Sequence, residues 1–195
     1  MKKPLLCEKV LFEEANDCNC YILACLEEKV ALVIDPGSYS PRLRDFLRER
    51  ELTLIGLFLT HGHGDHVSGL PDLQAELGPV PVFAGGREAE AFLLKVDRPV
   101  EDGDPLVLGS WEGCFRTTPG HTPGGTTLVI GGMAFTGDAL FSGSVGGTAT
   151  PEDFDQQIAA LREKVLSLPD DTLVHPGHGP SSTVGVERLY NSFFV

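Results

Sequence analysis

The stretch LFLTHGHGDHVSGL, residues 57–70, decides the fold and the site that this sequence predicts. It begins inside a continuous apolar run over residues 52–59, which is typical of a strand buried on both faces. The run leads into a loop with two glycines, at 62 and 64. Within six positions of this loop stand four side chains that commonly bind metal ions, namely His61, His63, Asp65 and His66. Such a cluster at the end of a buried strand predicts a metal site.

The spacing of these side chains has a physical reason. In extended backbone, alternate side chains point to the same side, so His61 and His63 can bind one cation. Asp65 and His66 lie where the chain bends, and they can turn toward a second cation. The alternative is that Asp65 only caps a helix that starts near His66, with the histidines as polar loop residues. So many ligand-type side chains in one short loop favour the metal site.

Composition limits the classes of partner. The chain has 195 residues, enough for one domain that buries about 70% of its unfolded surface, and we expect a single domain over residues 1–195. Fifteen Lys and Arg against 28 Asp and Glu give a net charge of −13. This charge favours neither a nucleic acid nor an anionic membrane surface. We therefore expect a small-molecule partner, and the sequence carries no signal of oligomeric state.

The N-terminal segment, the longest apolar run and the cysteines indicate the cellular compartment of the protein. The apolar core of Met1–Val10 is too short for a signal peptide, and the run over 52–59 is far shorter than a membrane span. We expect a cytoplasmic protein. The five cysteines are odd in number and lack CxxC spacing, so we interpret them as reduced, mostly structural thiols: Cys7, Cys18, Cys20, Cys25 and Cys114.

The apolar periodicity predicts alternating strands and helices. Strands are expected over 9–13, 19–26, 30–34, 52–59, 80–83, 106–108, 114–118, 126–130, 133–136 and 172–175, the last of them. Helices are expected over 40–51, 68–77, 86–94 and 151–166, and a loop over 97–105. This order predicts an α/β fold with two mixed sheets between helical layers.

Three further strands run into glycine turns that carry a ligand-type residue, namely His121, Asp138 and His178. Taken singly, each can be an ordinary loop residue or turn former. Ligands at strand ends of one sheet edge converge in space, however. Together with the first cluster they supply the seven ligands of a two-metal site. His175 lies inside the last strand, and we interpret it as structural.

At these residues the chain resembles the metallo-β-lactamase superfamily, and within it glyoxalase II (hydroxyacylglutathione hydrolase) and its shorter bacterial relatives. The resemblance rests on NCYIL at 19–23, VIDPG at 33–37, THGHGDH at 60–66, PGHTPGG at 119–125, TGDALFSGSVG at 136–146 and HPGHGPSST at 175–183. These motifs occur in the family's order over nearly the whole chain. They imply the αββα sandwich of that family.

Carried over residue by residue, the resemblance implies a first metal held by His61, His63 and His121, a second held by Asp65, His66 and His178, and Asp138 bridging the two. The ions are two divalent metals, zinc or else iron or manganese. The implied reaction is hydrolysis of a thioester by a hydroxide that bridges the two ions, with Asp65 and Asp138 as the catalytic carboxylates.

The chain departs from glyoxalase II at two places. That enzyme has a basic residue near the position of Gly147 and a C-terminal helical domain, whereas Gly146–Thr148 is neutral here and the sequence ends at Val195. The resemblance therefore does not extend to a glutathione-specific substrate. The tail, with Glu187, Arg188, Tyr190 and Asn191, is expected to serve as a surface helix and for packing rather than as a replacement binding site.

Two other functions compete with this interpretation. A persulfide dioxygenase uses one iron bound by two histidines and an aspartate, for which His61, His121 and Asp138 are available. Those enzymes tend to have alanine before the last histidine, whereas Gly177 precedes His178 here, as in the hydrolases. A non-catalytic scaffold would be expected to have an incomplete ligand set, and this set is complete.

Overall fold

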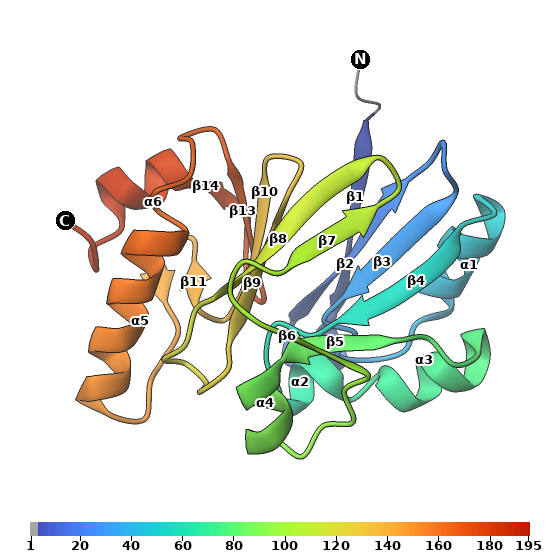
Figure 1. Cartoon of the computed structure of the whole chain (residues 1–195), viewed down its shortest axis with the longest axis horizontal. Helices are drawn as coiled ribbons and strands as arrows, with labels where there is room; N and C mark the ends of the chain where they lie inside the picture. Colours follow the sequence, from blue (N-terminus) through green and yellow to red (C-terminus); the bar gives the residue numbers. More distant parts are fainter. Residues whose placement is uncertain (1–3) are drawn as a thin grey trace.

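Two six-stranded sheets lie face to face between layers of helices (Figure 1). The computed structural model describes residues 4–195, so the first three residues of the segment Met1–Val10 lie outside the described residues. This arrangement is the αββα sandwich that the sequence predicts. Within the described residues, no helix combines the length and the apolar character that a membrane crossing requires.

The first sheet contains the strands β1 (Leu5–Phe12), β2 (Cys18–Cys25), β3 (Val30–Ile34), β4 (Thr53–Phe58), β5 (Val82–Gly85) and β6 (Arg98–Val100), in that order. A short 3₁₀ turn over Glu13–Ala15 joins β1 to β2. Strands β1 to β3 pair antiparallel, and β3 to β6 pair parallel. Parallel neighbours need crossover connections, supplied here by α1 (Pro41–Glu49), α2 (Gly64–Val67) with α3 (Leu70–Leu77), and α4 (Gly86–Ala91). The carboxyl ends of β3, β4 and β5 therefore share one edge.

The second sheet has the order β14 (Ser182–Thr183), β13 (Leu173–Pro176), β10 (Met133–Gly137), β9 (Thr126–Ile130), β8 (Trp111–Thr117) and β7 (Pro105–Leu108). Strands β10 and β13 are parallel, so the segments that follow them emerge side by side. A small hairpin, β11 (Leu140–Phe141) and β12 (Ser144–Val145), follows β10. Helices α5 (Pro151–Lys164) and α6 (Val184–Tyr190) lie on the outer side of this sheet (Figure 1).

Buried apolar side chains fill the space between the sheets and under the helices. The inner layer includes Leu23, Ile34, Phe58 and Phe135, none of them exposed. Strand β2 is buried over its whole length, because its other face packs under α1 and α3. At about 25 cal/mol per Å² of buried apolar surface, these layers dominate the stabilisation and hold the strand ends in place.

Two expectations about local structure were wrong. The expected loop over 97–105 contains β6, a strand too short and polar to give a periodic signal. The strand near 172–175 is not the last, because β14 follows it. The expected helix over 68–77 is confirmed as α3, and the one-turn helix α2 precedes it. The tail forms the helix α6 as predicted, and its residues Glu187 and Asn191 are buried by packing.

Candidate metal centre

All seven predicted ligand side chains come together at one edge of the sandwich, where strands of both sheets end. His61 and His63 follow β4, and Asp65 and His66 lie in α2. The others follow three strands of the second sheet, with His121 after β8, Asp138 after β10 and His178 after β13. The convergence that was expected from the strand-end turns is therefore present in the structure.

His61, His63 and His121 form the first trio, with one nitrogen of each within 4.8 Å of the others. Nδ1 of His63 lies 3.0 Å from Nε2 of His121. Nε2 of His61 is buried and has no hydrogen-bond partner. Burial, with the neighbouring His66, lowers the pKa of His61 well below its ordinary value. The trio therefore brings three ring nitrogens together, and burial favours the unprotonated form of His61.

Asp65, His66 and His178 form the second trio, again within 4.8 Å of one another. Nε2 of His66 lies 3.3 Å from Nε2 of His178, which in turn lies 3.4 Å from Oδ2 of Asp65. His66 is fully buried, whereas Asp65 is partly open to solvent. Asp65 is held in place by Asn16, whose Nδ2 donates to its Oδ2 at 3.2 Å.

Asp138 lies between the two trios. Its Oδ1 is 3.4 Å from His66 Nε2, and its Oδ2 is 3.5 Å from His178 Nε2 and 3.7 Å from His121 Nε2. Burial alone would raise the pKa of Asp138, but the facing imidazoles of His178 and His66 hold it far below its usual range. An ionised carboxylate within reach of His66 and His178 on one side and His121 on the other can bridge two cations.

The hydrogen bonds at the outer ring nitrogens show that these groups fit divalent cations. Nδ1 of His121 donates to the Gly147 carbonyl at 2.7 Å, and Nδ1 of His66 donates to Asp35 at 3.1 Å. A neutral imidazole that donates through Nδ1 carries a lone pair on Nε2. Two nitrogens bound to one tetrahedral cation at about 2.0–2.1 Å lie roughly 3.3 Å apart, close to the spacing within each trio. A cation between such nitrogens removes the repulsion of their lone pairs.

Asp35, at the end of β3, belongs to the motif VIDPG at 33–37 but was not predicted to be a site residue. Thr60 donates to it twice, from N to Oδ1 at 2.8 Å and from Oγ1 to Oδ2 at 2.7 Å. It lies near His61 and His66 but faces the Nδ1 side of His66, away from the other ligands, and both its oxygens are engaged. Asp35 therefore orients a ligand, as carboxylates behind metal-bound histidines commonly do. A carboxylate directly after a buried strand was the available signal.

The cysteines are free thiols, as predicted, but Cys18 is more than a packing residue. Its sulfur lies 3.6 Å from Nδ1 of His66, in a fully buried position. Burial raises the pKa of Cys18, with Asp35 and Asp138 contributing in the same direction. The Cys18 thiol and the Asp35 carboxylate thus both lie beside Nδ1 of His66, the ring nitrogen that faces away from the second trio.

The turn that carries His178 is attached to β2. Nδ2 of Asn19 donates to the carbonyls of Pro176 at 3.0 Å and Gly179 at 2.9 Å, and the Tyr21 hydroxyl donates to Pro176 at 2.7 Å. His175 lies between aromatic rings, with its Nδ1 2.9 Å from Ser181 Oγ. Burial lowers the pKa of His175 to about 4. These contacts agree with a structural interpretation of His175.

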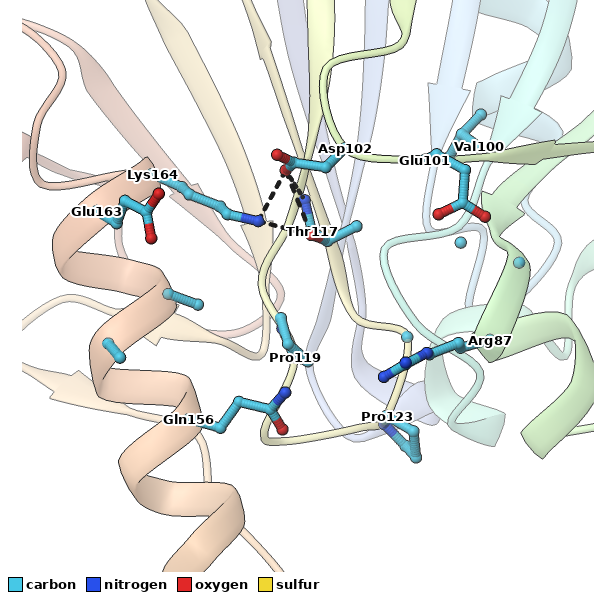
Figure 2. A pocket seen from close by; sticks show the side chains of 15 residues that line it. Arg87, Val100, Glu101, Asp102, Thr117, Pro119, Pro123, Gln156, Glu163 and Lys164 are labelled. Atoms are coloured by element: carbon cyan, nitrogen blue, oxygen red, sulfur yellow. Dashed lines mark hydrogen bonds and ion pairs between the residues drawn. The ribbon is translucent and has the colours of Figure 1, made fainter.

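Two hollows lie near the centre. One, of about 260 Å³, opens beside Asp65 and is also lined by Asn16 and Ser68. The other, of about 450 Å³, lies between α4 and α5, with Arg87 on one wall and Gln156 on the other (Figure 2). No candidate ligand is among the described residues that line this second cavity. Of these two, the hollow beside Asp65 is the one that a predicted ligand lines.

Comparison with known proteins gives a consistent picture. The family model described as metallo-beta-lactamase superfamily matches residues 14–178. Hydroxyacylglutathione hydrolase GloC of Haemophilus influenzae is 35% identical over 189 residues, covering 86% of this chain and 88% of that protein. The human mitochondrial persulfide dioxygenase ETHE1 is 36% identical over 194 residues, covering 93% and 73%. The crystal structure of TTHA1623 in a di-iron-bound form superposes with a TM-score of 0.77 at 32% identity, covering 95% of this chain and 99% of that one.

Proposed function

The chain belongs to the metallo-β-lactamase superfamily, and we propose that it is a dinuclear metal-dependent hydrolase that cleaves thioesters. The observation that carries the proposal is the pair of ligand trios joined by one carboxylate. We assign His61, His63 and His121 to a first metal, Asp65, His66 and His178 to a second, and Asp138 to both. A centre with a single metal would not require the three ligand side chains of the second trio.

Both metals are divalent, and we propose zinc. Imidazole and carboxylate ligands also accept iron and manganese, and the relative TTHA1623 has been crystallised with two irons. Two such cations, when bound, lower the pKa of a shared water toward neutrality and polarise an acyl carbonyl. Side chains of this chain carry out the remaining steps, which are charge stabilisation and proton transfer.

We assign Asp138 the role of a negative charge at the centre and Asp65 the role of a proton acceptor. Asp138 stays ionised at the centre, because His66 and His178 stabilise its charge. Asp65 borders the open hollow and is oriented by Asn16, so it is placed to hold a proton of the attacking water. The water oxygen bonds to the acyl carbon and the carbon–sulfur bond breaks. The thiolate leaves with little need of a proton, since a thiol pKa is about 8.5.

The substrate we propose is an acyl thioester of a small thiol. The likeness to GloC, named a hydroxyacylglutathione hydrolase, supports this class. At the position where glyoxalase II has a basic residue, Gly147 contributes only its carbonyl, which accepts from His121. This position therefore contributes no positive charge for a substrate carboxylate, and we do not restrict the thiol to glutathione.

The test is thiol release from S-D-lactoylglutathione and from simpler acyl thioesters, followed with a disulfide reagent. We expect turnover that disappears on removal of metal by a chelator and returns with two equivalents of zinc. If no thiol is released from any of these thioesters while both metals are bound, the hydrolase proposal is wrong.

A persulfide dioxygenase is the second candidate, supported by the 36% identity to ETHE1. It would use His61, His121 and Asp138 with one iron. Gly177 favours the hydrolase, because a methyl group there would overlap Oδ1 of Asp138, which is assigned to both metals, and approach Cε1 of His66 in the second trio. Oxygen uptake with glutathione persulfide, in protein that holds one iron per chain, would favour the dioxygenase.

A further inference from the structure

Glu88, in α4, connects the two loops that carry the first trio. Its side chain is fully buried. The Gly62 N–H donates to Oε1 at 2.8 Å, and the Gly124 N–H donates to Oε2 at 2.8 Å. Gly62 stands between His61 and His63, and Gly124 belongs to the loop of His121. Each carboxylate oxygen thus holds one loop.

A backbone hydrogen bond also joins the two segments. The Thr126 N–H donates to the Thr60 carbonyl at 2.9 Å, but this bond lies at the strand ends, before the loops diverge. On its outer side, the loop of His121 packs against Gln157 of α5 at Gly120. It borders the 450 Å³ cavity at Pro119 and Pro123 (Figure 2).

On the inner side, the contact with α4 is close. A methyl group at Gly124 would overlap the backbone of Glu88, and one at Gly62 would overlap the ring of Phe92, the residue after α4. Both loops therefore need glycine in order to approach this helix. A buried carboxylate is costly unless it is fully hydrogen-bonded, and two N–H donors from two loops meet that need.

We propose that Glu88 is a positioning residue for the first metal. It sets the separation between the His61–His63 loop and the His121 loop, and thereby the affinity of this trio for a divalent cation. The inference rests on the proposed function only in that the trio binds a metal, and it does not depend on the thioester substrate.

The chain offers a matched control in Glu187, on α6. Glu187 is also fully buried and also accepts a backbone N–H from a loop, that of Gly143 at 2.9 Å, together with Nδ2 of Asn191 at 2.8 Å. The residues it joins include no candidate ligand. The substitution Glu187→Gln therefore shows how the fold responds when a buried, hydrogen-bonded carboxylate away from the centre is removed.

The experiment compares wild type, Glu88→Gln and Glu187→Gln as metal-free protein titrated with zinc. Histidine-ring proton–nitrogen NMR spectra report which imidazoles bind at each equivalent, and a competing chelator gives both dissociation constants. An amide can accept from only one loop and presents its NH₂ to the other, so we expect Glu88→Gln to weaken the His61–His63–His121 metal about 10–100-fold. The second metal and the Glu187→Gln protein should shift far less. Hydrogen exchange in metal-free Glu88→Gln should rise over 60–64 and 119–125.

Glu88→Asp provides a second variant if the glutamine protein does not fold, because the shorter carboxylate keeps its charge but reaches only one loop. Wild-type affinity for the first metal in either variant would overturn the proposal. Equal weakening of both metals, matched by Glu187→Gln, would also overturn it. If thioester hydrolysis is absent but the selective loss of the first metal is seen, the proposed function fails and the role of Glu88 stands.

Discussion

The two halves of the centre are held in different ways. In the first half, the loops are fixed through their backbones, by Glu88 bound to Gly62 and Gly124. In the second half, the ligand itself is fixed, because Asp35 accepts directly from Nδ1 of His66. Each half thus has a buried carboxylate behind its ligands: Glu88 accepts from main-chain N–H groups, whereas Asp35 accepts from an imidazole and from Thr60.

The difference follows from where the ligands lie. His66 is in α2, buried against the first sheet, so its position is set by packing and only its ring needs orientation. The first trio comes from two loops on different sheets, and Glu88 connects the backbones of these two loops. The second half should therefore respond mainly through ligand orientation, and the first through loop movement.

The largest effect is expected from Asp138→Ala, which removes the group shared by both halves. Both metals should bind at least about 100-fold more weakly, since loss of even an indirect partner costs 10–100-fold. Elemental analysis after dialysis against a chelator checks this, with circular dichroism to establish that the variant folds. Loss of only one metal would mean that Asp138 belongs to one half.

Asp35→Asn tests the second half. The amide cannot accept from both Thr60 and His66, so the ring of His66 loses its orientation, and we expect the second metal to bind about 10–100-fold more weakly. The same ring spectra and chelator competition measure it. Asp104→Asn, at a loop carboxylate that accepts the Glu101 N–H, is the control. Selective loss of the first metal would contradict the division into halves.

Gly177→Ala adds one methyl group against Asp138 and His66. Overpacking of this kind costs about 1–3 kcal/mol, so we expect roughly tenfold weaker binding of the second metal, with the first retained. Metal content per chain measures it. Two metals at wild-type affinity would show that Gly177 does not favour the dinuclear centre.

Phe92→Ala gives the smallest expected effect, on the first half. The Phe92 ring stands edge-on to His63 at a centroid distance of 5.3 Å. Such pairs contribute about 0.5–1.5 kcal/mol, so affinity for the first metal should fall about 2–10-fold. Phe154→Ala, which removes a ring contact between Phe154 on α5 and Phe193, should leave both affinities unchanged.

Much of the centre was predictable from sequence because its ligands follow recognisable strands. Apolar runs located the ends of β4, β8, β10 and β13, and glycine turns marked the side chains there. Since strand ends on one edge converge, local patterns were enough to predict that these ligands meet.

The supporting residues were not predictable in the same way. Glu88 lies in the segment GREAEA, where nothing local separates it from the exposed Glu90. Only the tertiary approach of Gly62 and Gly124 to α4 distinguishes the two. Likewise, Glu187 reads as part of a surface helix until the loop of Gly143 meets it. Residues whose partners lie far away in the sequence leave no periodic signal.

Anomalous diffraction from crystals of the zinc-loaded protein tests the two-metal assignment most directly. We predict two zinc peaks about 3.5–4 Å apart, one among His61, His63 and His121 and one among Asp65, His66 and His178, with Asp138 between them. A single peak at full zinc loading, with the second trio empty, would contradict it.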